Sequence, residues 1–184
     1  MAKIRVLLTD DHTLFRQGMR TLLAAEPDIE VVGEAANAAD AVALASQDRP
    51  DVVLMDIGMT GMSSFEATRQ IRKERPETRV IFLSMYDDED YLAESVEIGA
   101  SGFILKESPA DQLLSAIREV HRGGNYLSPR LLSRLVDDFR LQGRSPLTGQ
   151  SFLIFRLWRS DRVRRRRCGG ACQGVVTCAW RSRP

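Results

Sequence analysis

Three aspartates, a serine and a lysine occupy positions in the sequence from which they could together accept a phosphoryl group. Asp10 and Asp11 follow one short apolar run, Asp56 and Ser84 each end another, and Lys106 follows a fourth. Carboxylate oxygens are the ligands that hard divalent cations such as Mg²⁺ prefer, and an aspartate can act as a nucleophile that forms an aspartyl phosphate. A cation and a lysine would offset the charge on the phosphoryl oxygens during transfer. These residue types therefore predict phosphoryl transfer to Asp56, if the fold brings them together.

Alternating strand and helix patterns predict the element order that would do so. Apolar, β-branched runs lie at 4–9, 30–35, 52–56, 80–84 and 102–105. Stretches with helical spacing lie between and after them, at roughly 13–25, 38–48, 64–75, 89–99 and 109–122. Such βα units build a parallel sheet covered by helices on both faces. We predict an α/β, flavodoxin-like, doubly wound sheet of five parallel strands in the order 2-1-3-4-5.

In that order the first and third strands are neighbours, and their carboxyl ends share one edge of the sheet. Asp10, Asp11 and Asp56 would then meet in one crevice, where three like charges are unfavourable unless a cation or protons neutralise them. Mg²⁺ is the cation that this reasoning favours. The alternative is structural: Asp10 and Asp11 cap the first helix, since Asp is a common N-cap residue.

Four motifs carry a resemblance to a known family. They are Asp10-Asp11-His12, Met55-Asp56-Ile57-Gly58-Met59, Leu83-Ser84-Met85 and Gly99-Ala100-Ser101-Gly102-Phe103-Ile104-Leu105-Lys106. With these motifs, residues 3–122 resemble the receiver domain of two-component response regulators of the NarL/FixJ (LuxR-type) family. The resemblance implies a signalling protein rather than an enzyme.

The resemblance also implies roles for single residues. Asp56 would be the phosphoacceptor and would bind Mg²⁺ together with Asp10 and Asp11, with the backbone carbonyl of Gly58 as a further ligand. Ser84 would hydrogen-bond the phosphoryl group, and Lys106 would pair with it. Phe103 would be the switch residue, which changes rotamer as Ser84 moves inward.

The loop after Asp56 departs from the family's usual pattern, Met-Pro-Gly-Met-Asp-Gly. Here the sequence reads Met59-Thr60-Gly61-Met62-Ser63-Ser64. Losing the proline frees φ at Thr60, and a serine at position 64 costs energy if that residue needs a positive φ. We therefore expect a less rigid loop beside an intact acceptor.

Three nearby residues have a structural interpretation beside a functional one. His12 is interpreted as a helix-start residue rather than a catalytic base. Phe103, without the resemblance, is an ordinary strand residue of the core. Tyr86 could tune hydrolysis of the phosphate or simply pack its loop.

Charge divides the chain near residue 140. Residues 1–139 hold 15 Lys and Arg against 24 Asp and Glu, a net charge of −9, whereas 140–184 hold 11 Arg and one acidic residue, a net charge of +10. We predict three regions: a receiver domain (1–123), a linker with an amphipathic helix bearing Leu131, Leu135 and Phe139 (124–146), and a basic tail (147–184).

The basic tail would be a remnant or disrupted helix-turn-helix effector region. Pro146-Leu147-Thr148 matches the opening of the family's DNA-binding module, but the residues after Thr148 do not continue its pattern. Three interpretations stay open: an arm that binds nucleic acid through phosphate contacts, a solvated disordered extension, or an out-of-frame translation of a former DNA-binding module. Cys168, Cys172 and Cys178 lack a fourth ligand and the spacing of a zinc site, so we expect no metal there.

Taken together, these patterns predict a response regulator whose Asp56 accepts phosphate from a sensor histidine kinase to control transcription, with DNA and a second copy as further partners. One alternative is a stand-alone receiver that acts through protein–protein contacts. Another is a phosphatase that works through an aspartyl phosphate, although no substrate pocket or additional acid is evident. No apolar run approaches the roughly 18 residues of a membrane span, and no signal peptide is evident, so we expect a cytoplasmic protein without membrane contact.

Overall fold

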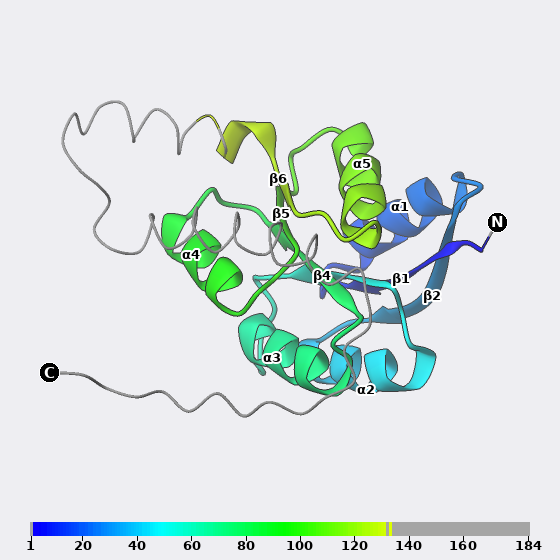
Figure 1. Ribbon diagram of the computed structural model, residues 1–184, viewed down its shortest axis with the longest axis horizontal. Helices are drawn as coiled ribbons and strands as arrows, with labels where there is room; N and C mark the ends of the chain where they lie inside the picture. The colour runs from blue at the N-terminus through cyan, green and yellow to red at the C-terminus, as the bar shows by residue number, and fades with distance from the viewer. Residues whose placement is uncertain (1, 132, 134–184) are drawn as a thin grey trace, which may run out of the picture.

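A parallel sheet forms the centre of the computed structural model, which describes residues 2–131 and 133 (Figure 1). In this part of the chain the strand order is β2-β1-β3-β4-β5-β6, and every neighbouring pair is parallel. The elements are β1 (Ile4–Thr9), α1 (Thr13–Ala24), β2 (Ile29–Ala35), α2 (Ala38–Asp48), β3 (Val52–Asp56), α3 (Ser64–Glu74), β4 (Arg79–Ser84), α4 (Glu89–Glu97), β5 (Gly102–Leu105), α5 (Ala110–His121) and β6 (Tyr126–Leu127).

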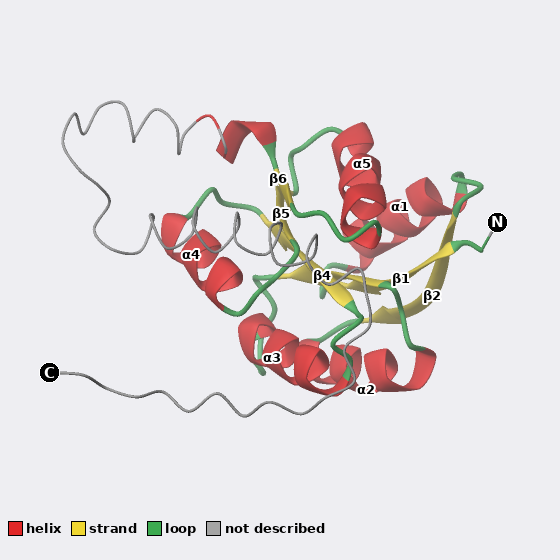
Figure 2. Cartoon of the chain, viewed as in Figure 1, coloured by secondary structure: helices red, strands yellow, loops and turns green. Residues whose placement is uncertain are grey.

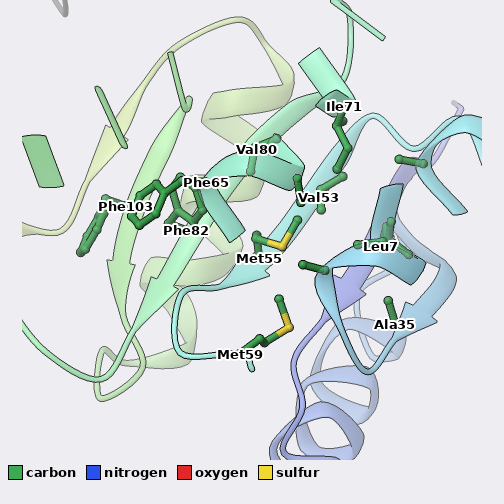
Figure 3. Close-up of a cluster of buried hydrophobic side chains, with 14 of the residues drawn as sticks. Leu7, Ala35, Val53, Met55, Met59, Phe65, Ile71, Val80, Phe82 and Phe103 are labelled. Carbon is green, nitrogen blue, oxygen red and sulfur yellow. The ribbon is translucent and has the colours of Figure 1, made fainter. Parts of the chain in front are cut away.

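Helices cover both faces of the sheet, as the sequence predicted (Figure 2). Successive strand residues point to opposite faces, so each central strand supplies two hydrophobic clusters. Val6, Leu54 and Ile81 pack toward α1 and α5, whereas Met55 and Phe82 pack toward α2, α3 and α4. Figure 3 shows the second cluster, in which the rings of Phe65 and Phe82 lie 5.0 Å apart. Because β3 is buried along its whole length, Asp56 at its end is held by a rigid core.

The predicted order of the first five strands is confirmed, and the predicted element boundaries either coincide with the observed ones or differ from them by at most two residues. The structure adds one strand, β6, which pairs Tyr126 with Gly102 and Leu127 with Phe103. A two-residue strand has no periodicity to detect, and the sequence alone predicts a linker at these residues.

A helix begins at residue 129, after Ser128, as the Ser128-Pro129 pair indicated. Its residue Leu131 is buried in the hydrophobic cluster shown in Figure 3. Most of the predicted linker helix, with Leu135 and Phe139, and the whole basic tail with its cysteines lie outside the described residues. Among the helices that are described, none is long and apolar enough to cross a membrane.

Candidate functional site

The carboxyl ends of β1, β3 and β5 bring an acidic cluster and a lysine together. The Nζ atom of Lys106 lies 2.6 Å from Oδ2 of Asp10 and 3.0 Å from Oδ2 of Asp56, and all three side chains are almost completely buried. Asp11 and His12 follow Asp10, and ligand atoms of the three aspartates and the histidine lie within 4.8 Å of one another. The three carboxylates therefore meet at one edge of the sheet, as expected from the strand order.

Local contacts hold each of these groups in place. The backbone N–H of Lys106 donates to the Ser84 carbonyl (2.7 Å), and its ammonium lies 4.6 Å from the centre of the Phe15 ring. The backbone N–H of His12 donates to Oδ1 of Asp10 at 2.8 Å. Asp10 thus fixes the turn before α1, while the N-cap position itself belongs to His12, whose side chain makes no capping hydrogen bond. Neither aspartate caps α1 through its side chain in the way the structural alternative required.

Two further residues bind the main chain of the aspartates, and sequence reasoning missed both. Nη1 of Arg16, in α1, donates a hydrogen bond to the Asp10 carbonyl (2.6 Å), and the same guanidinium forms an ion pair with Glu34 of β2. The hydroxyl of Ser64, at the start of α3, donates to the Asp56 carbonyl at 2.5 Å. Residue types do not indicate which side chain binds a main-chain carbonyl. The one available signal was the position of Arg16, one helical turn after His12.

The cluster carries more negative than positive charge. Three carboxylates face one lysine, and burial raises the pKa of the Asp56 carboxyl, with the hydrogen bond from Lys106 opposing that rise and the charge of Asp10 adding to it. Oδ2 of Asp10 is buried with the Lys106 ammonium 2.6 Å away, and Oδ1 of Asp11 is buried 2.9 Å from Nδ1 of His12; neither oxygen accepts a hydrogen bond of good geometry. Carboxylate oxygens from three aspartates, gathered around a single lysine, suit a hard divalent cation and are the donor set that Mg²⁺ prefers.

Ser84 ends β4, and Phe103 lies on the neighbouring strand β5. The Ser84 hydroxyl donates to the Tyr86 carbonyl (2.7 Å) and accepts from the Tyr86 backbone N–H (3.1 Å). Phe103 is buried in the core cluster of Figure 3. Tyr86 is 73% exposed, which argues against a role in packing its own loop.

Comparison with known proteins identifies the class to which this fold and site belong. Residues 6–118 match the family model described as "Response regulator receiver domain". That match spans more than half of the chain, so the protein belongs to the response regulator receiver family. A crystal structure of a LuxR-family two-component response regulator from Aurantimonas sp. SI85-9A1 covers 74% of this chain and 98% of its own, with 33% identity and a TM-score of 0.71. For the response regulator domain of Thermotoga maritima CheB, the identity is 34% and the TM-score 0.60, over 65% and 97% of the two chains.

The relatives among well-characterised proteins are regulators of the NarL/LuxR type. The transcriptional regulatory protein DegU of Brevibacillus brevis is 41% identical over 75% of this chain and 58% of its own length. The oxygen regulatory protein NreC of Staphylococcus carnosus is 40% identical over 74% of this chain and 63% of its own length. The transcriptional regulatory protein LiaR of Bacillus subtilis is 39% identical over 80% of this chain and 70% of its own length. The chain therefore spans about three fifths of the length of the first two relatives. Membership of this family confirms the predicted receiver and favours a signalling protein over the phosphatase alternative.

Proposed function

We propose that this receiver takes a phosphoryl group on Asp56, in a reaction that requires Mg²⁺, from the phosphohistidine of a sensor histidine kinase. The observation that carries the proposal is the buried contact of Lys106 with both Asp10 and Asp56, next to Oδ1 of Asp11, which is buried and accepts no hydrogen bond. In water such a cluster would repel itself. At a phosphoacceptor it provides a nucleophile, a cation site and a fixed positive charge at one edge of the sheet.

Each residue has a definite part in the proposed step. An Oδ atom of Asp56 attacks phosphorus, an O–P bond forms, and the N–P bond of the donor phosphohistidine breaks, which leaves its imidazole as the leaving group. Asp10, Asp11, Asp56 and the Gly58 carbonyl would hold Mg²⁺, which supplies charge neutralisation for the phosphoryl oxygens when bound. The Lys106 ammonium would pair with a phosphoryl oxygen in addition to its present carboxylate partners.

Ser84 and Phe103 would report the modification. The phosphoryl group adds a charge of about −2, which would draw the Ser84 hydroxyl away from Tyr86 and toward the new oxygens. Phe103 neighbours this movement on β5, where it pairs with Leu127 of β6. A shift at Phe103 would therefore reach the strand that leads into the C-terminal part of the chain.

For the output we propose control of transcription. The names of DegU and LiaR describe transcriptional regulatory proteins, and the +10 charge of residues 140–184 would attract a polyanion. A homodimer, DNA as partner and a cytoplasmic location complete this proposal. The second candidate is a receiver that acts through protein contacts alone, which the departure of the tail from the family's helix-turn-helix pattern favours. DNA binding that disappears on removal of residues 140–184 would support the first; phosphorylation-dependent partner binding without any DNA binding would support the second.

Phosphorylation itself is tested with Mg²⁺ and acetyl phosphate, followed by intact mass measurement. We expect wild type to gain one phosphoryl group, and to gain none in excess EDTA or as Asp56→Asn. Asp51→Asn is the matched control, because Asp51 precedes β3 and lies at the opposite end of the same strand. A mass gain in Asp56→Asn, or none in wild type with Mg²⁺, would refute the proposed acceptor.

A further inference from the structure

The loop after Asp56 returns to that residue through a single buried hydroxyl. Ser64 is the first residue of α3 and is 1% exposed. Its Oγ lies 2.5 Å from the Asp56 carbonyl oxygen and 3.5 Å from that of Ile57. A hydroxyl has one proton to donate, and the shorter distance assigns it to Asp56. Ser64 therefore ties the end of β3 to the beginning of α3.

The same loop also contacts the side chain of Asp56. The backbone N–H of Gly58 donates to Oδ1 of Asp56 at 3.3 Å, so the loop binds the residue at both its carboxylate and its carbonyl. Both ends of the loop are anchored in the core, by Met59 and Phe65, which are buried in the cluster of Figure 3. Before these anchors, the hydrogen bond of Ser64 to the Asp56 carbonyl and that of the Ile57 N–H to the Leu83 carbonyl (3.0 Å) hold the peptide that leads toward Gly58.

The structure also answers the sequence-based concern about a serine at this position. Of the described non-glycine residues, only Arg49 has a positive φ, so Ser64 carries no such strain; Gly61, with φ of +92°, takes the left-handed position in the loop. The Ser64 carbonyl accepts a hydrogen bond from Thr68 Oγ1 (2.8 Å) within α3. The loop after Asp56, which the sequence predicted to be less rigid, thus contains a side-chain hydrogen bond, from Ser64 to Asp56, that a glycine could not form.

We propose that Ser64 is a positioning residue for the metal and phosphoacceptor site, and that it acts through the main chain of Asp56. The proposal rests on the function proposed above. Without the hydroxyl, the Asp56 carbonyl would lose this donor. The Asp56–Ile57 peptide would still be held through its N–H, which donates to the Leu83 carbonyl at 3.0 Å, but less firmly in the geometry that a metal ligand set requires. The effect should appear chiefly in Mg²⁺ affinity, because the nucleophile and Lys106 are unchanged.

Titration calorimetry with MgCl₂ on wild type, Ser64→Ala and Ser63→Ala tests this role. Ser63 is the matched control: its hydroxyl accepts from the Phe65 backbone N–H (3.2 Å) and caps α3, and no bond from it to Asp56 is found in the described structure. We expect Ser64→Ala to raise the Kd for Mg²⁺ about fivefold, the equivalent of one hydrogen bond worth about 1 kcal/mol. Ser63→Ala should change the Kd less than about twofold, although loss of a cap lowers its Tm. Equal shifts in both variants, or no shift in Ser64→Ala, would overturn the proposal.

Phosphorylation by acetyl phosphate at increasing Mg²⁺ gives a second readout. Ser64→Ala should need more Mg²⁺ for its half-maximal rate and reach the wild-type rate at saturation, whereas a uniform loss at every concentration would contradict a role in metal positioning. If wild type neither binds Mg²⁺ nor takes up phosphate, the proposed function fails; if wild type does both and Ser64→Ala matches it, only the role of Ser64 fails. Should Ser64→Ala not fold, Ser64→Cys, a near isostere with a weak S–H donor, replaces it, and a Kd equal to wild type would again overturn the proposal.

Discussion

Removal of the buried lysine from the acidic cluster should destabilise the protein in a way that Mg²⁺ repairs. Lys106 contacts Asp10 at 2.6 Å and Asp56 at 3.0 Å, and 4% of each of these side chains is exposed. Lys106→Met preserves much of the volume but leaves two buried carboxylates without their cation. Loss of one partner of a buried ion pair costs about 3–5 kcal/mol. For a domain of this size, that corresponds to a decrease in Tm of about 10–20 °C.

The assay is thermal unfolding followed by circular dichroism, in EDTA and in excess MgCl₂. Because a divalent cation at the cluster would take over the neutralisation, Mg²⁺ should raise the Tm of Lys106→Met more than that of wild type. Lys73→Met serves as the control: Lys73 is exposed near the end of α3, so this substitution removes the same charge far from the cluster. The reasoning is refuted if Lys106→Met loses no more stability in EDTA than Lys73→Met, or if Mg²⁺ stabilises wild type and Lys106→Met equally.

Two further predictions concern arginines. Arg16→Gln should weaken Mg²⁺ binding severalfold in calorimetry, because the Arg16 guanidinium donates to the Asp10 carbonyl at 2.6 Å. Arg20→Gln is the control: Arg20 pairs with the same glutamate, Glu34, and its loss should leave Mg²⁺ affinity unchanged. Equal effects would show that the ion pair with Glu34 matters and the carbonyl contact does not. Arg118→Met should lower the free energy of unfolding at pH 7 by about 1 kcal/mol or less, as for an exposed pair. The hydrogen bond from Arg118 lowers the pKa of Asp28 from its ordinary 3.8, so the stabilisation is present above that pH and is lost as the pH falls below it. In urea denaturation, the difference in free energy of unfolding between wild type and Arg118→Met should therefore shrink as the pH falls below 3.8. A difference that stays constant with pH would contradict this prediction.

Much of the fold could be predicted because it depends on repeated patterns. Apolar β-branched runs alternating with helical spacing define the order of the first five strands, and residues that end those runs must lie at one edge of a parallel sheet. The meeting of Asp10, Asp56 and Lys106 followed from that topology alone. By contrast, β6 contains two residues and is stabilised by its pairing with Gly102 and Phe103, which no local pattern indicates.

The supporting contacts of the site could not be predicted for a different reason. Arg16 and Ser64 bond main-chain carbonyls, and every residue has a carbonyl, so only the three-dimensional arrangement selects the partner. Ser64 illustrates the difficulty: its residue type suggested backbone strain, whereas its conformation places the hydroxyl on Asp56. The roles of Ser84 and Phe103 in switching depend on a second, phosphorylated arrangement and remain predictions.

The location of the phosphoryl group tests the central claim most directly. After incubation with Mg²⁺ and acetyl phosphate, borohydride reduces an aspartyl phosphate to homoserine and releases phosphate, and peptide mass spectrometry then locates the changed residue. We expect the change at Asp56 alone, and only when Mg²⁺ is present. Labelling at Asp10 or Asp11, or labelling of Asp56 that is the same in EDTA, would contradict the account.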